Sequence, residues 1–452
     1  MLSILLFAVE NKGKMSGLVT KVRSVLFVFY FLLSTLGVLN TQELANSGNI
    51  TSEEGPLETL MNDAAQNHPS LKAAYLNWQA SLEKIPQSAA LPDPIFSTGY
   101  FILPVETRLG PQRMRLSLNQ QFPWFGTLKA KKDKASQEAA VAYAAFEVIK
   151  SELLFDVKQQ YFTLFGTKKQ IELTEEQLAL FKSMESLMLE NYQNDLVELS
   201  ELLRLQMQIA EKETNLTNLK QSFKAQQISL AEKTGVILSE NPNWQVSLPD
   251  TLTNLSVKYT LDALIDSAKS VNPTAYLFKQ QIKVANKEID LSQYASKPKI
   301  NAGLDYGLLG QRTDANPENN GRDILMPMVG ISLPIFNKKS YRSVENEARL
   351  NLERNSEKHQ AYLNQLESQL NTTYTNFKNK QNTWALLTEQ QNTLQQIETL
   401  TQEKYSNATA KFTDLLKVKI AQIDLEIGKQ KAMVEMAIDK AKLQQLSGLE
   451  KI

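Results

Sequence analysis

The side chains that could do chemistry are few and scattered along this chain. There are two histidines and no cysteine, which excludes disulfides, thiol nucleophiles and cysteine-ligated zinc. His68 precedes a proline near an expected helix start, and His359 lies in a lysine- and glutamine-rich helical stretch, so solvated surface positions are expected for both. The sequence contains no His-x-x-x-His pair, phosphate loop, nucleophile elbow or paired acid–base constellation. The sequence therefore predicts no enzyme, no cofactor and no metal site.

Neither the methionines nor the net charge points to a binding site. Met184, Met188 and Met207 lie in predicted helices, where filling the core is expected rather than copper ligation. Forty-nine basic residues balance forty-nine acidic ones, so no net field would attract nucleic acid. We therefore expect no nucleic-acid partner.

The chain after residue 56 repeats itself. Pro69 and Pro273 lie 204 residues apart in similar segments, and the junctions "FPWFG" and "LPIFN" lie 211 residues apart at Pro123 and Pro334. Tyr192 recurs as Tyr405, 213 residues later. Such steady offsets are typical of an internal duplication. We predict a first repeat at 57–235, an equatorial connector at 236–260 and a second repeat at 261–448.

Each repeat has the same expected order of helix, two strands and a long helical stretch broken once. The first helices are predicted at about 57–90 and 261–296, and the strands at about 95–105, 113–122, 299–309 and 324–333. Proline is missing from 124–241 and from 335–452, as an unkinked helix requires. Leucines such as Leu202, Leu205 and Leu216 follow a three-four spacing, which predicts coiled-coil packing.

Two of the strand segments, "RMRLSLNQQF" and "KINAGLDYGL", alternate in polarity. In "KINAGLDYGL" the apolar residues Ile300, Leu304 and Tyr306 alternate with Asn301, Asp305 and glycines. This pattern fits a barrel strand with lipid outside and water inside. A half-buried strand of a soluble sheet is the alternative, but the largely polar helices offer no second apolar layer.

The two junctions combine proline with aromatic residues. A proline ends a strand because it cannot donate to the ladder, and exposed aromatic rings are favoured at a membrane interface. The predicted interface junction consists of Phe122, Pro123, Trp124, Phe125, Pro334 and Phe336.

The first forty residues carry a targeting signal. Lys21 and Arg23 precede an apolar run of signal-peptide length, so 1–40 is predicted to be a cleaved signal peptide, and 41–56 a linker. A membrane anchor is the alternative, although the run is short for one. Met15 is an alternative start.

A further motif of the form Tyr-x8-acid-Leu-Leu occurs in both repeats, at Tyr192–Leu203 and Tyr405–Leu416. Together with the duplicated order and both junctions, it resembles the TolC family of outer-membrane factors. "ALPDP" followed by "QQFPWFGTL" is similar to its heavy-metal branch, the cobalt–zinc–cadmium and copper–silver exporters. The resemblance covers nearly everything from about residue 57.

The resemblance implies a mainly α protein with a small membrane β-barrel. Four strands per chain cannot close a barrel, so the family architecture is a homotrimer with a 12-stranded β-barrel continued by a long α-helical barrel. The implied function is that of a passive outer-membrane channel in a tripartite efflux system. Its implied partners are outer-membrane lipid, a periplasmic adaptor and an inner-membrane pump of the resistance-nodulation-division type, and its implied substrates are metal cations or drugs.

The resemblance also implies a periplasmic gate at the helix turns, about 193–198 and 406–411. Asp195 stands where the family usually has a turn glycine, and Lys411 stands beside the usual basic position. Glu201 and Asp414 would form acidic rings or interhelix hydrogen bonds; solvation of a helix face is the alternative role for these charges. The candidate tip residues are Tyr192, Asp195, Glu201, Tyr405, Lys411 and Asp414. A periplasmic or secreted coiled-coil protein without a channel is the competing function.

Overall fold

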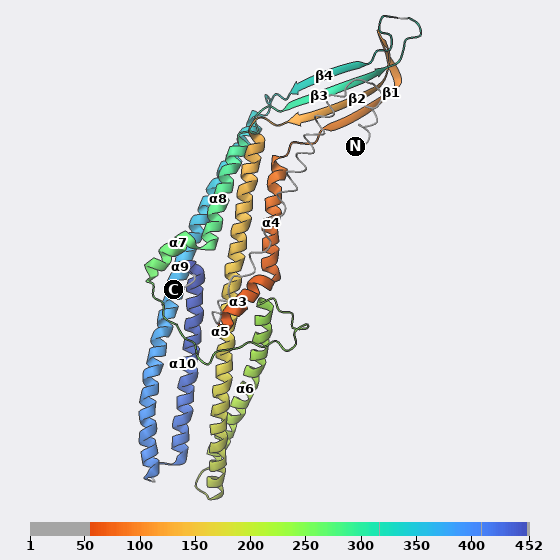
Figure 1. The fold of residues 1–452 in the computed structure, drawn as a ribbon. Helices are drawn as coiled ribbons and strands as arrows, with labels where there is room; N and C mark the ends of the chain where they lie inside the picture. Colours follow the sequence, from red (N-terminus) through yellow and green to blue (C-terminus); the bar gives the residue numbers. More distant parts are fainter. Residues whose placement is uncertain (1–54, 316, 408, 450–452) are drawn as a thin grey trace, which may run out of the picture. The chain divides into compact units, whose positions relative to one another are not determined.

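The computed structural model describes residues 55–449 except 316 and 408, so the predicted signal peptide, the start at Met15 and nearly all of the linker lie outside the described residues. The helix–strand–strand–long helix order occurs twice, which confirms the predicted fold class (Figure 1). The first repeat contains α3 (Pro56–Asn67), α4 (Pro69–Ala89), β1 (Ile95–Thr107), β2 (Gly110–Phe122), α5 (Thr127–Gln193) and α6 (Leu199–Lys233). The second contains α7 (Leu261–Val271), α8 (Pro273–Ser292), β3 (Ile300–Leu309), β4 (Ile324–Ile331), α9 (Lys338–Ser406) and α10 (Phe412–Ser447).

The expectation of one continuous first helix in each repeat is wrong. Each is broken into two helices, at His68 and at Asn272, and both residues have a non-helical backbone with ψ of 122° and 127°. The next residue in each case is the proline that marks the repeat, Pro69 or Pro273. A proline lacks the N–H that a helix interior needs and pushes the preceding residue out of helical geometry, so the break is local in origin.

Each break is braced by the end of a distant helix. Just beyond α6 and α10, Gly235 and Gly448 have φ of +74° and +71°, the left-handed conformation that favours glycine. A Cβ on Gly235 would lie 2.8 Å from the backbone carbon of Asn67, and one on Gly448 would lie 3.1 Å from that of Val271. The glycines thus let the helix ends approach the breaks closely, at equivalent places in the two repeats.

The long helices pack as two hairpins. Figure 1 shows α5 beside α6 and α9 beside α10, and α5 also packs against α4, α8 and α10. With 67 residues, α5 is about 100 Å long at 1.5 Å per residue. Its hairpin with α6 buries Phe181, Met184, Met188, Leu202, Leu205 and Ile209 together.

One expectation about a single residue needs correction. Met207 is 73% exposed, because it lies on the opposite side of α6 from the Leu202–Leu205–Ile209 seam, and so does not fill the core of this chain. None of the described helices combines the length and apolarity needed to cross a membrane.

The four strands form one antiparallel sheet in the order β1-β2-β3-β4. Paired residues share a face, so the pairs Phe96–Leu118, Leu118–Leu304 and Tyr306–Leu325 place apolar side chains together on one side. Side chains on this face are exposed in the single chain, including Phe96 at 64% and Val329 at 76%. The sheet therefore has an apolar face that no described residue covers, and β1 and β4 each pair on one edge only.

Candidate functional site

The junction after β2 is a short, defined break before a long helix. The Thr127 N–H donates to the Trp124 carbonyl at 3.0 Å, and Gly126 precedes α5 with φ of +89°. This φ favours glycine, and a Cβ at Gly126 would also lie 2.7 Å from the Tyr294 hydroxyl. Pro123 and Trp124 are half-buried, and Phe122 is 37% exposed.

Both junctions present aromatic rings to the surroundings. Phe125 is 79% exposed and stands edge-on to Trp124, with ring centroids 6.0 Å apart. In the second repeat Phe336 is 94% exposed and follows the half-buried Pro334. Rings so exposed suit an interface between apolar and aqueous surroundings.

The turn between α5 and α6 is a hydrogen-bonded loop at the end of a helix. Tyr192 lies in the last turn of α5 and is 39% exposed, and its carbonyl accepts from the Asp195 N–H at 3.0 Å. Asp195 has φ of +55°, the conformation for which glycine is favoured, at the position where the family resemblance implies a glycine. Glu201 lies in the first turn of α6 and is exposed.

The turn between α9 and α10 is capped by a carboxylate. Asp414 accepts a hydrogen bond from the Lys411 backbone N–H at 3.2 Å, and the Asp414 N–H donates to the Lys411 carbonyl at 3.0 Å. The carboxylate also lies 3.8 Å from the Lys417 ammonium. Tyr405 packs its ring 5.7 Å from that of Phe412. Asp414 therefore stabilises the start of α10, a role that the sequence prediction did not include.

A cavity of about 680 Å³ lies between the ends of the two hairpins. It brings Glu201, Lys411 and Asp414 together, with apolar walls from Met184 and Met188. Tyr192, Asp195 and Tyr405 are not among its lining residues. The structure thus joins the two acidic candidates at one cavity, which Lys411 and Lys417 of the second repeat also line.

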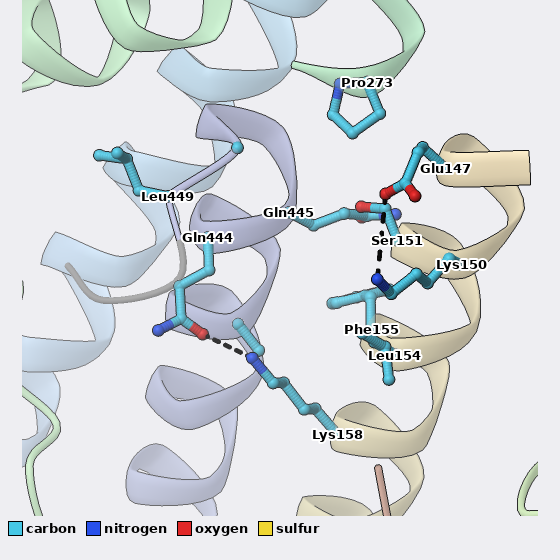
Figure 2. Close-up of a pocket in the computed structure, with 12 residues that line it drawn as sticks. Glu147, Lys150, Ser151, Leu154, Phe155, Lys158, Pro273, Gln444, Gln445 and Leu449 are labelled. Carbon is cyan, nitrogen blue, oxygen red and sulfur yellow. Dashed lines mark hydrogen bonds and ion pairs between the residues drawn. The ribbon is translucent and has the colours of Figure 1, made fainter. Parts of the chain in front are cut away.

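A second cavity, of about 220 Å³, lies between α5, the end of α10 and the start of α8 (Figure 2). In it the Lys158 ammonium donates to the Gln444 side chain at 3.0 Å, and Lys150 lies 4.0 Å from Glu147. No histidine or cysteine is among the residues that line it. The first contact joins α5 to α10 and the second lies within α5, and neither holds a base against a nucleophile.

The expectation that both histidines are solvated is wrong in part. His68 Nδ1 and His359 Nε2 are buried and have no hydrogen-bond partner. Burial, followed by the nearby Lys279 charge, lowers the pKa of His359 below its ordinary value. Among the described residues no group of three or more His, Cys, Asp or Glu side chains could hold a metal ion.

One long-range contact was not predicted. Arg115 of β2 and Asp305 of β3 form an ion pair across the sheet. The alternation in the sequence placed each on a polar face, but only the strand register could show that the two side chains meet.

Solved structures resemble this chain closely in fold. No protein-family model and no curated protein matches its sequence. The chain matches the outer membrane protein VceC from Vibrio cholerae at a TM-score of 0.70 and 16% identity, over 88% of this chain and 97% of VceC. CusC, described for its transmembrane channel formation, matches at a TM-score of 0.69 and 14% identity, over 87% of this chain and 92% of CusC. The open MtrE outer membrane channel of Neisseria gonorrhoeae matches at a TM-score of 0.68 and 15% identity, over 87% of this chain and 89% of MtrE.

The chain has the fold of these outer-membrane channels. This result agrees with the resemblance to the TolC family drawn from the duplicated order and the junctions. The likenesses to CusC, VceC and MtrE are nearly equal, so the heavy-metal branch stays a prediction, as does the trimer.

Proposed function

We propose that this chain is the channel subunit of a tripartite efflux system in the cell outer membrane. The observation that carries the proposal is the sheet: one face is apolar and exposed, the other carries the polar and charged side chains of β2 and β3 beside the apolar residues Ile324, Met326 and Met328 of β4, and both edge strands pair on one side only. Lipid would cover the apolar face, and water would fill the space on the other side.

Closing the sheet requires more than one copy. Unpaired strand edges are costly in lipid, because no water is present to satisfy their N–H and C=O groups. Three copies of a four-stranded sheet would place β4 of each chain beside β1 of the next and close a 12-stranded barrel. The hairpins α5–α6 and α9–α10 would continue the wall as a helical barrel in the periplasm, which makes the protein a passive duct.

The duct needs partners that supply energy and cargo. A periplasmic adaptor would dock at the hairpin ends, and an inner-membrane pump of the resistance-nodulation-division type would load the solutes. Metal cations and drugs are the two proposed substrate classes. The susceptibility of a deletion strain to copper, silver, zinc and cobalt salts, compared with a panel of drugs, separates the two classes.

The hairpin ends would hold the periplasmic gate. Glu201 and Asp414 line one cavity there, and three copies would bring six carboxylates to the narrow end of the duct. The double variant Glu201→Ala, Asp414→Ala is expected to raise single-channel conductance and to lower cation selectivity. Values equal to those of the unmodified protein would remove the gate role and leave helix capping as the function of Asp414.

The test of the function itself is the native mass of the protein extracted in detergent from purified outer membranes. A trimer that conducts ions in planar bilayers is expected. Deleting both strand pairs, 95–122 and 300–331, should convert a detergent-requiring protein into one that needs no detergent. A monomer or dimer in the periplasmic fraction would instead support the coiled-coil protein without a channel.

A further inference from the structure

The polar face of the sheet has a definite layout. The register pairs Ser117 of β2 with Asp305 of β3, and Arg115 with Gly307 two residues along. Because paired residues share a face, Arg115, Ser117 and Asp305 all lie on the side opposite the apolar one. This is the side that faces the pore in the proposed channel.

Glycines on β3 leave room for the longer side chains of β2. A Cβ on Gly303 would collide with Oδ1 of Asn119, and one on Gly307 would lie 3.2 Å from Nε2 of Gln112. The polar side chains of β2 therefore lie across β3 at these positions instead of projecting from the wall. On this side of β3 Asp305 stands between the two glycines, and Met326 of β4 lies opposite it.

Asp305 depends on Arg115 for its charge balance. Its side chain is 5% exposed and its Oδ2 pairs with Arg115 Nη2, while its Oδ1 is buried and accepts no hydrogen bond. The Arg115 side chain is 50% exposed. Removing one partner would leave an unbalanced charge on this face. Such a charge would act on passing ions, because charges in the wall of a pore are screened less than charges in bulk water.

We propose that the Arg115–Asp305 pair balances the charge that β2 and β3 present to ions at this level of the β-barrel pore. This inference rests on the proposed channel, in which three copies place three such pairs around one pore. Each balanced pair exerts little field at the axis, so the pair adds no preference for cations or anions to the barrel. The pair thereby leaves selection of the substrate to other parts of the system.

The two single variants should act in opposite directions. Asp305→Asn leaves three arginines and favours anions, whereas Arg115→Gln leaves three aspartates and favours cations. For three charges about 10 Å from the axis, screened over one Debye length in 0.1 M salt, the ratio of K⁺ to Cl⁻ permeability should change roughly four-fold each way. The double variant should return the ratio to that of the unmodified protein.

The experiment measures reversal potentials of purified channels in planar bilayers under a KCl gradient. Arg312→Gln is the matched control, because it breaks an ion pair of the same chemistry with Asp314, two residues away in the loop after β3; its shift should be much smaller. Asp305→Asn is the primary variant, since it leaves the half-exposed Arg115 rather than a buried carboxylate. It decides the question if Arg115→Gln fails to assemble.

The outcomes distinguish this inference from the channel proposal. If the unmodified protein carries no current, the channel proposal fails. If it conducts and Asp305→Asn leaves the reversal potential unchanged, or if both single variants shift it in the same direction, the neutrality role is overturned and the ion pair only braces two strands. Lower thermal stability alone, without a shift in reversal potential, also counts against the proposal.

Discussion

The break between α7 and α8 is held by one asparagine, and its equivalent in the first repeat lacks those bonds. Asn272 is 4% exposed, and its Oδ1 accepts from the Ala275 N–H and from the Tyr362 hydroxyl, both at 3.0 Å. Its Nδ2 donates to the Leu446 carbonyl of α10 at 3.0 Å. The equivalent residue, His68, makes no side-chain cap bond.

Replacing Asn272 with alanine should therefore be costly. The lost N-cap costs about 1 kcal/mol. The buried Leu446 carbonyl would lose its partner, at about 1–3 kcal/mol. We expect a total loss of about 2–4 kcal/mol in the free energy of unfolding. Tyr362→Phe, which removes one of the three hydrogen bonds of the Asn272 side chain, should cost about 1 kcal/mol.

The opposite change in the first repeat should stabilise the protein. His68→Asn would supply the missing cap of α4 and remove the unpartnered Nδ1, for a gain of about 1–2 kcal/mol. His68→Ala separates the two contributions, because it removes the nitrogen without adding a cap. The measurement is the denaturant midpoint of detergent-solubilised protein, followed by far-UV circular dichroism.

Two results would refute this reasoning. A loss below about 1 kcal/mol for Asn272→Ala would show that the buried contacts of Asn272 do not hold the break. A destabilising His68→Asn would show that the two breaks are not equivalent, although the prolines and glycines around them are. The exchange variant Asn272→His should reproduce most of the loss seen with alanine.

Three further changes test individual contacts. Lys440→Met removes hydrogen bonds to the carbonyls of Asn254 and Ser256 at 2.6 and 3.0 Å, so limited proteolysis should cut the connector near residue 254 faster. Burial, and then Glu435, raise the pKa of Asp439 to about 6. Since this folded pKa exceeds the unfolded one, the loss of folding stability caused by ionising Asp439 is absent below pH 4 and complete above pH 6. Asp439→Asn should therefore raise the melting temperature at pH 7.5 and leave it unchanged at pH 4. Asp414→Ala should destabilise the first turn of α10 by about 1 kcal/mol, seen as faster amide exchange there, whereas Asp414→Asn should cost less.

Local chemistry made much of the fold predictable. Long helices without proline and two strands of alternating polarity depend on neighbouring residues, and the nearly constant offsets reveal the duplication. Together they indicate the order of elements. The break at Pro69 was missed although the proline itself was noticed, because proline is tolerated in the first turn of a helix and a lone proline shows only that a helix starts or bends nearby. The structure shows that two helices meet there.

The contacts that give the fold its specific chemistry depend on register, which local pattern does not fix. Arg115 and Asp305 are 190 residues apart, and a shift of one residue in the pairing of β2 with β3 would have sent the two side chains to opposite faces. The register is set by the apolar residues of the other face: Leu116 opposite Tyr306 and Leu118 opposite Leu304. The apolar pairs thus place the polar pair, so lipid-facing substitutions that disturb this pairing should alter ion selectivity without touching a charged residue.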